Sequence, residues 1–177
     1  TYGLAGPYER IEGTIYFAVD PNNPANRIIT DIDDAPRNAD GKVEFRSDFY
    51  LIKPKDISRG NGTLFYEVSN RGGKGMLRYY NNARGSRDPR TDEEMGDGFL
   101  LEHGFTLLWV GWQFDVPLGE GRVRVFLPIA TDNGTPITGL VRSEVIVSEV
   151  AYDRSLADRN HQAYEVVDPS DPANVLT

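Results

Sequence analysis

Apolar and polar residues alternate along several short segments of the chain, and this pattern predicts a protein built mainly from β-strands. Residues 10–20 alternate through Ile15, Phe17 and Val19, and residues 42–54 continue in the same way until a proline ends them. Further strands are predicted at 27–33, 63–69, 105–113, 122–130 and 140–150. Turns separate these segments, because the chain carries 18 Gly and 11 Pro.

The pattern changes to helical spacing between two of these strands. Residues 92–104 begin with acidic residues, repeat apolar residues at helical spacing and end at Gly104, which predicts one short helix. Gly96 and Gly98 weaken its first half, so a start near Asp97 is the alternative. The strand before it, 63–69, has apolar residues at both parities and is expected to be covered on both faces. A strand, a helix and the strand at 105–113 form a β-α-β unit, so the two strands are expected to be parallel neighbours with a right-handed crossover.

The predicted fold class is therefore α/β and β-rich, with a mixed sheet. Antiparallel strands come first, one β-α-β unit follows, and residues 114–150 form a β-hairpin excursion. The dipeptide Asn133-Gly134 is a hairpin signal, although a later proline and glycine lengthen the loop. Residues 151–177 form a polar tail whose last residues are typical of the start of a strand. The 177 residues are a single domain or the N-terminal portion of a larger one.

Composition and charge exclude several partners. The net charge of −8 repels phosphate backbones, so nucleic acid is not expected to bind. No apolar stretch approaches the roughly 20 residues that cross a bilayer, so no membrane partner is expected. The absence of cysteine removes thiol chemistry and Cys-based zinc sites. A cleaved signal peptide would explain the start at Thr1 and favours a secreted or periplasmic location.

Neither a metal nor a cofactor is predicted. The chain has two histidines, and His103 is expected to stabilise the C-terminal end of the predicted helix. The acidic cluster Asp31, Asp33 and Asp34 lacks the loop glycine and the distal glutamate of an EF-hand and is expected to be a solvated turn. Trp109 and Trp112 lie in an apolar run, where core packing is expected rather than a sugar-binding platform. No serine lies in a Gly-x-Ser-x-Gly motif.

The glycine-rich segment that follows the strand at 63–69 carries the strongest chemical signal. Phosphate binding is not expected there, because Gly75 occupies the Ser/Thr position of a P-loop and Arg78 the third glycine of a dinucleotide fingerprint. Glycines do let backbone N–H groups approach a reacting oxygen and stabilise its developing negative charge. The alternative is a plain glycine turn that joins a strand to a helix.

The order of elements and four phrases resemble the N-terminal part of the bacterial proteins described as "alpha/beta hydrolase domain-containing". The phrases, which span most of residues 8–150, are "YERIEGTIYFAVDPNNPANRIITDIDDAPRNADGKVEF", "DFYLIKPKDISRGNGTLFYEVSNRGGKG", "GDGFLLEHGFTLLWVGWQFDVP" and "PIATDNGTPITGLVRSE". The resemblance implies that residues 8–113 are the early strands and helix A of an incomplete α/β-hydrolase fold, in which the third strand runs into an oxyanion loop.

The resemblance also implies the residues of that loop. It places "SNRGG" (69–73) where many esterases carry His-Gly-Gly-Gly, so the backbones of Asn70, Arg71, Gly72 and Gly73 are the candidate oxyanion donors. Asn70-Arg71 replaces His-Gly, and the Arg71 side chain is expected to form a buried ion pair or to receive a substrate carboxylate. In this family the nucleophile, the acid and the histidine follow the strand that here ends near Trp112, so the triad is not in this chain.

The function implied is the N-terminal portion of a serine, carboxylic-ester hydrolase. Its partners would be a small-molecule ester and the remainder of the hydrolase, as a continuing chain or a separate fragment, and this chain alone would be inactive. Two alternatives stay open. One is a self-contained β-rich module that binds carbohydrate, and the other is an interaction protein whose open sheet edge pairs with a partner strand.

Overall fold

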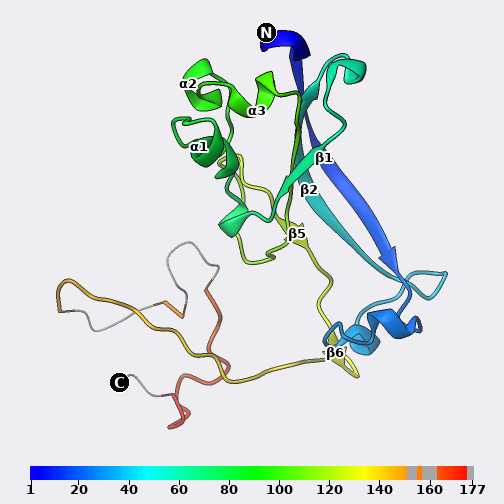
Figure 1. Ribbon diagram of the computed structural model, residues 1–177. Coiled ribbons are helices and arrows are strands. Elements are labelled where there is room, and N and C mark those ends of the chain that lie inside the picture. Colours follow the sequence, from blue (N-terminus) through cyan, green and yellow to red (C-terminus); the bar gives the residue numbers. More distant parts are fainter. Residues whose placement is uncertain (151–154, 157–162, 175–177) are drawn as a thin grey trace. The chain divides into compact units, whose positions relative to one another are not determined.

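The computed structural model describes residues 1–150, 155–156 and 163–174 (Figure 1). The chain divides into two units, Thr1–Ile137 and Thr138–Thr177. In the described part of the second unit the chain forms no helix or strand. Residues 151–154, 157–162 and 175–177 of the expected polar tail, with most of the strand start predicted at the chain end, lie outside the described residues.

The first unit contains short helices and one long antiparallel pair of strands. The strands are β1 (Tyr8–Val19), β2 (Val43–Pro54), β3 (Leu64–Glu67), β4 (Thr106–Val110), β5 (Val125–Phe126), β6 (Thr131–Asp132) and β7 (Thr135–Pro136). The α-helices are α1 (Met76–Tyr80), α2 (Asp92–Met95) and α3 (Phe99–Glu102). Short 3₁₀ turns are η1 (Gly3–Ala5), η2 (Pro24–Asn26), η3 (Ile32–Asp34), η4 (Ile57–Arg59) and η5 (Asn70–Gly72).

The main sheet is mixed and has the order β1-β2-β4-β3, with β5 paired to β2. Both β1 and β4 lie antiparallel to β2. The strands β3 and β4 are parallel, with Phe65 beside Leu107 and Glu67 beside Trp109. The parallel pairing predicted for 63–69 and 105–113 is therefore confirmed, and so is the coarser prediction of a β-rich, mixed α/β sheet.

The core lies on one face of this sheet, and Figure 1 shows α1, α2 and α3 grouped on one side of the strands. The buried core residues are Tyr50, Ile52, Met76, Leu77, Ala83, Leu100, Leu101, Leu107, Trp109 and Val123. Each large apolar side chain buried in this way stabilises the fold by about 1.5–3 kcal/mol. The three helices are short, so packing on the sheet rather than helix propensity accounts for their stability.

The opposite face of the sheet is apolar but incompletely covered. The strand register places Ile11 beside Leu51, Leu51 beside Leu108, and Leu108 beside Tyr66, which makes one apolar row across four strands. Ile11 and Tyr66, at the ends of the row, are exposed, and the two leucines between them are half-buried. Contiguous exposed apolar surface of this kind is typical of an interaction surface.

The expectation that the strand at 63–69 is covered on both faces is wrong, because one face of β3 is open; β3 is also an edge strand. Leu64, Tyr66 and Val68 are all exposed. The Thr106 amide donates to the Thr63 carbonyl, so residues of the other parity, including Leu64 and Tyr66, direct their backbone N–H and C=O groups away from β4. Apolar side chains at both odd and even positions of a strand do not distinguish a strand buried inside a sheet from an exposed strand at its edge.

The helix predicted over 92–104 is two helices, α2 and α3, and α1 was not predicted. Gly96 ends α2 with φ 74°, where an added Cβ would lie 1.9 Å from the Asn81 carbonyl oxygen. The fully buried Asn81 joins the pieces, because its side chain donates to Met95 O and accepts from the Leu100 amide. One buried amide thus satisfies the end of one helix and the start of the next.

Two predicted strands are absent and one is reduced. Residues 27–33 form turns rather than a strand, because Asp31 has φ 55° and β1 pairs directly with β2 across this excursion. Of 122–130 only β5 forms, and the described residues 140–150 contain no strand. Alternation alone does not make a strand where the unit offers no neighbour to pair with.

A hairpin does turn at Asn133-Gly134, but it joins β6 and β7, each two residues long, and not the strands predicted at 122–130 and 140–150. Asn133 and Gly134 have φ values of 48° and 83°, as a two-residue turn between β6 and β7 requires. The longer loop that was expected there is wrong, since Thr135 and Pro136 already belong to β7.

Tyr50 is expected to make the first unit less stable at alkaline pH. Its ring is buried, its hydroxyl donates to Pro89 O, and burial raises its pKa to about 12 from 10.0. The folded protein therefore keeps this proton when the unfolded chain loses it. The stabilisation is complete below about pH 10 and is lost as the pH rises through about 12. We expect the free energy of unfolding, measured with urea, to fall more steeply over this range in the wild type than in Tyr50→Phe; equal slopes would contradict this.

Candidate functional site

The predicted loop, residues 69–73, begins where β3 ends and forms the turn η5. Ser69 is extended and buried, and the chain then turns through Arg71 at φ 54° and Gly72 at φ 71°. Left-handed backbone at a non-glycine residue is uncommon and marks a conformation held by its surroundings. Because β3 and β4 are parallel, this turn lies at the C-terminal edge of the strand pair.

Two of the four candidate amides already donate within the chain. The Arg71 N–H donates to the side-chain oxygen of Gln113 at 2.7 Å, and the Gly73 N–H donates to Asn70 O at 3.1 Å. The Gly72 residue is buried, and an added Cβ would lie 2.6 Å from Val123 O. Asn70 is exposed, and among the described residues its amide meets no acceptor. Asn70 is thus the candidate whose N–H is best placed for a ligand.

The Arg71 side chain forms the ion pair that was one of its two expected roles. Its guanidinium lies 2.7 Å from Asp115 Oδ1 and 3.1 Å from Asp115 O, and both side chains are largely buried. The Arg122 guanidinium donates to Arg71 O. These contacts hold the left-handed turn in place.

The Glu67 side chain accepts hydrogen bonds from the backbone amides at the start of α1. Its carboxylate accepts from the amides of Gly75 and Met76, at 3.0 and 2.8 Å, and from the indole N–H of Trp109. The backbone donors at the start of α1 therefore already hold a negative charge, and it belongs to this chain. Trp109 is fully buried, so its predicted core role is confirmed.

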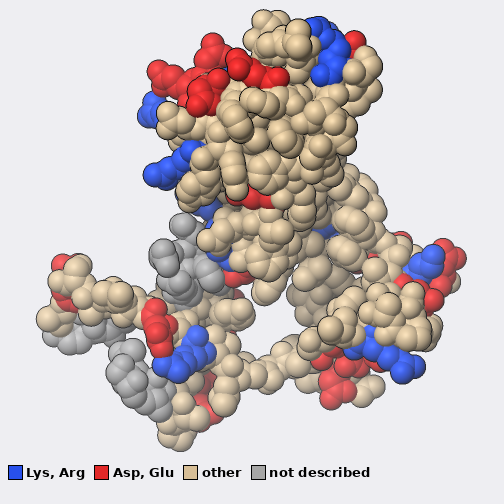
Figure 2. Space-filling model, viewed as in Figure 1, with Lys and Arg blue, Asp and Glu red and all other residues tan. Residues whose placement is uncertain are grey.

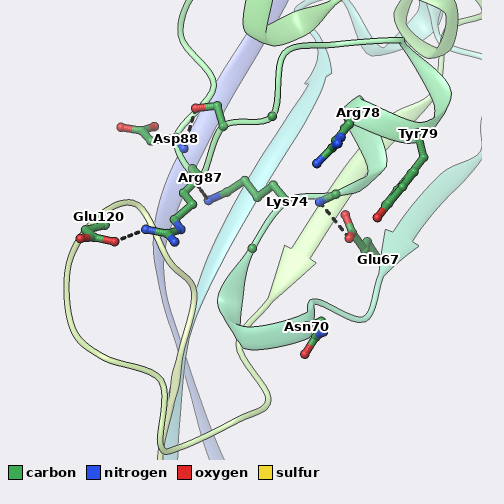
Figure 3. A pocket seen from close by; sticks show the side chains of 12 residues that line it. Glu67, Asn70, Lys74, Arg78, Tyr79, Arg87, Asp88 and Glu120 are labelled. Carbon is green, nitrogen blue, oxygen red and sulfur yellow. Dashed lines mark hydrogen bonds and ion pairs between the residues drawn. The ribbon is translucent and has the colours of Figure 1, made fainter. Parts of the chain in front are cut away.

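A pocket of about 740 Å³ lies beside the loop. It is lined by Glu67, Asn70, Gly73, Lys74, Gly75, Arg78, Tyr79, Gly85, Ser86, Arg87, Asp88 and Glu120. Figure 3 shows Arg78 and Tyr79 reaching from α1 on the same side as Glu67, Arg87 and Glu120 on the other side, and Lys74 between them. The pocket is open to solvent, because several of its lining side chains, including Arg78, Tyr79 and Glu120, are exposed.

Lys74 is a buried cation in the wall of this pocket. Its side chain is almost completely buried, and its Nζ donates to Arg87 O and to Gly121 O and lies 4.3 Å from the centroid of the Tyr50 ring. Burial lowers the pKa of Lys74 to about 8. The ammonium connects two loops, which are far apart in the sequence, and it contacts Tyr50 on the sheet.

The carboxylates of the pocket are all engaged. Glu67 is held by amides, and Asp88 pairs with Arg10 and Arg90. Glu120 pairs with Arg87 and Arg122. Among the described residues, by contrast, no hydrogen bond or ion pair engages the guanidinium of Arg78.

Lysine and arginine residues are concentrated in this part of the chain. Residues 71–90 contain a single acidic residue, Asp88, and six basic ones: Arg71, Lys74, Arg78, Arg84, Arg87 and Arg90. Figure 2 shows Lys and Arg side chains along the side of the first unit that carries α1. The local charge is therefore opposite in sign to the net charge of −8.

Other predicted features lie away from the pocket or differ from expectation. His103 follows α3 and its Nδ1 lies 2.8 Å from Phe99 O, which fits the expected position at a helix C-terminus. Trp112 is 53% exposed, so its expected burial in the core is wrong; its indole N–H donates to Ser69 O. His161 lies outside the described residues.

Neither a metal site nor a membrane span is found in the part of the chain that the structure describes. No group of three or more potential ligand side chains gathers there; Asp33 and Asp34 lie in the turn η3, and Asp31 immediately precedes it. None of its helices has the length and apolar character needed to cross a bilayer.

Comparison with known proteins adds no family assignment. No protein-family model, curated protein or solved structure matches this chain. The resemblance to α/β hydrolases therefore stays a prediction.

Sequence reasoning identified the loop but missed Glu67, Lys74 and Arg78. The excess of basic residues over 71–90 was a signal that pointed to this region. No local pattern, however, shows that Glu67 would turn back to the start of α1, since that contact depends on where β3 and β4 place the helix.

Replacing Lys74 tests its role in joining the two loops. Lys74→Met keeps the apolar stem but leaves Arg87 O and Gly121 O without this donor, so we expect it to lower the free energy of unfolding by about 2–4 kcal/mol. The matched control is Lys55→Met, which replaces an exposed lysine and is expected to change stability by less than about 0.5 kcal/mol. Equal stability of the two variants in urea would show that Lys74 does not hold the loops.

Proposed function

We propose that this chain is the N-terminal portion of a serine, carboxylic-ester hydrolase and that it supplies a backbone oxyanion donor. The nucleophilic serine, the acid and the histidine then belong to the remainder of the hydrolase, which is a continuing chain or a separate fragment. The substrate is a small-molecule ester. In this proposal residues 1–177 have no esterase activity alone.

The position of the Asn70 amide carries the proposal. Asn70 follows the end of β3, beside the parallel strand β4, and it lines the pocket of about 740 Å³. Hydrolases of this superfamily take one oxyanion donor from the loop after the third strand. A single donor is worth about 10²–10³ in kcat, so one available amide is chemically significant.

The open edge and the incompletely covered face of the sheet support the proposal that the remainder of the hydrolase completes this sheet. Leu64 and Tyr66 direct unpaired backbone groups away from β4, and the apolar row from Ile11 to Tyr66 is incompletely covered. A further parallel strand on the edge and a layer on the face would satisfy both features.

Chemical labelling tests whether such an enzyme exists. The natural protein, with every polypeptide that copurifies with it, is treated with a fluorophosphonate probe, and the labelled peptide is identified by mass spectrometry. We expect a labelled serine that lies outside residues 1–177. Labelling of a serine within these residues would contradict the proposal, and so would a sample that carries no labelled serine.

Replacing Asn70 by proline tests the oxyanion role directly. Proline removes the amide hydrogen, and it suits the site because Ser69 is extended at φ −63° and ψ 126° and Asn70 is the first residue of a turn. We expect Asn70→Pro to lower the kcat of the assembled hydrolase by about 10²–10³ with little change in KM.

The control for this experiment is Asn70→Ala, which removes the side chain and keeps the amide. It is expected to retain kcat within a few-fold. If both variants lose the same activity, the Asn70 side chain matters and its amide is not the oxyanion donor.

The edge of β3 also favours a second function, an interaction module that binds a partner strand without chemistry. The outward backbone groups of Leu64 and Tyr66 are the observation in its favour. A stable partner that protects these amides from hydrogen exchange but carries no fluorophosphonate-reactive serine would support this second function over the first.

A further inference from the structure

We propose that the pocket beside residues 70–75 binds a carboxylate group of the substrate, with Arg78 as its principal ligand. The substrate class is then an ester that also carries a carboxylate. This inference rests on the proposed function for the ester part only. The recognition of the carboxylate depends on the charges of the pocket itself.

Every carboxylate that lines the pocket has hydrogen-bond or ion-pair partners, although the three basic and three acidic lining side chains balance in charge. The Glu67 carboxylate is occupied by two amides and an indole N–H, Asp88 by Arg10 and Arg90, and Glu120 by Arg87 and Arg122. No carboxylate of the pocket therefore remains for the Arg78 guanidinium among the described residues. A ligand anion would supply the missing partner.

Arg78 is placed where a ligand can reach it. It extends from α1 and lines the same pocket as Asn70 and Ser86 (Figure 3). The Gly85 backbone lies against it, with the position of a Cβ on Gly85 only 3.6 Å from Arg78 Cδ. Asn70 adds a neutral hydrogen-bonding group to the wall, whereas the Ser86 hydroxyl is already bonded to the Asp88 amide and the Glu94 carboxylate.

The Arg71 side chain does not take this role, although it is the arginine nearest the loop in sequence. Its guanidinium is already paired with Asp115, and it holds the turn rather than the pocket, of which it is not a lining residue. Of the two roles that the sequence allowed for Arg71, the structure gives it the ion pair, and the carboxylate passes to Arg78.

A carboxylate fits the pocket better than a phosphate. A guanidinium binds a carboxylate through two parallel N–H···O bonds, and one cation balances one negative charge. A phosphate dianion would require a second cation, but Arg87 is shared with Glu120 and Lys74 donates to two carbonyl oxygens. The loop also lacks the residues of a phosphate-binding motif.

The arrangement indicates how a substrate would lie. With its carboxylate at Arg78 and its ester carbonyl at the Asn70 amide, a small molecule spans the pocket between two of its lining residues. The ion pair fixes the orientation of the substrate, and the amide stabilises the oxygen that becomes negative during attack.

Binding of monomethyl succinate, which carries one ester and one carboxylate, tests the inference on the 177-residue chain. Its Kd is measured by NMR titration for the wild type, for Arg78→Gln and for Arg84→Gln. The two variants lose the same charge, but Arg84 pairs with Glu93 at the surface and does not line the pocket. Because Arg78 is exposed, we expect Arg78→Gln to weaken binding by about three- to five-fold and Arg84→Gln to leave the Kd unchanged.

Two further ligands test whether the carboxylate of monomethyl succinate, rather than its ester or any anion, accounts for binding. Dimethyl succinate lacks the carboxylate and is expected to bind about three- to five-fold more weakly than monomethyl succinate. Inorganic phosphate is expected to bind more weakly than monomethyl succinate. The inference is overturned if the two variants behave alike, if the neutral diester binds as well, or if phosphate binds as tightly and competes.

The binding and labelling experiments fail independently. Absence of a fluorophosphonate-reactive serine would remove the hydrolase and leave the measured Kd values unchanged. Conversely, loss of discrimination between Arg78→Gln and Arg84→Gln would remove the carboxylate site and leave the esterase proposal in place.

Discussion

The carboxylate of Glu67 connects the parts of the first unit on which the candidate site depends. Glu67 lies at the end of β3, and it accepts hydrogen bonds from Trp109 on β4 and from the amides of Gly75 and Met76 at the start of α1. A charged acceptor makes these bonds about twice as strong as neutral ones. Because the Glu67 side chain bonds to the amides of Gly75 and Met76, the two ends of the loop between Glu67 and Gly75 are held together. The residues between them are thereby confined to one small turn.

Two other buried polar side chains also connect separate segments of the fold by hydrogen bonds. Lys74 joins two loops to the core face of the sheet, and Asn81 satisfies the end of α2 and the start of α3. The helices are too short to be stable alone, so their polar termini need such partners. The result is a pocket wall made largely of loops, held in place by a few specific hydrogen bonds rather than by long helices.

The distribution of charge around this wall gives the pocket its chemical character. A chain with a net charge of −8 gathers six basic side chains within residues 71–90, and most of them are paired with carboxylates or donate to carbonyl oxygens. Paired charges of this kind position loops, whereas an unpaired guanidinium at the pocket is available to a ligand. The distinction between structural and ligand-binding arginines therefore rests on their partners and not on their number.

The sequence by itself determined the two long strands, the parallel pair and the position of the glycine turn at its end. Alternation and turn residues are local properties, and a helix between two apolar segments leaves parallel pairing as the economical topology. Only the tertiary structure decided that β3 is an edge strand, that 27–33 and 140–150 are not strands, and that Trp112 is exposed. It also decided that Glu67 occupies the amides beyond the glycines and that Arg71 pairs with Asp115. These outcomes depend on which segments become neighbours, and a linear pattern records how apolar a residue is but not which partner covers or pairs with it.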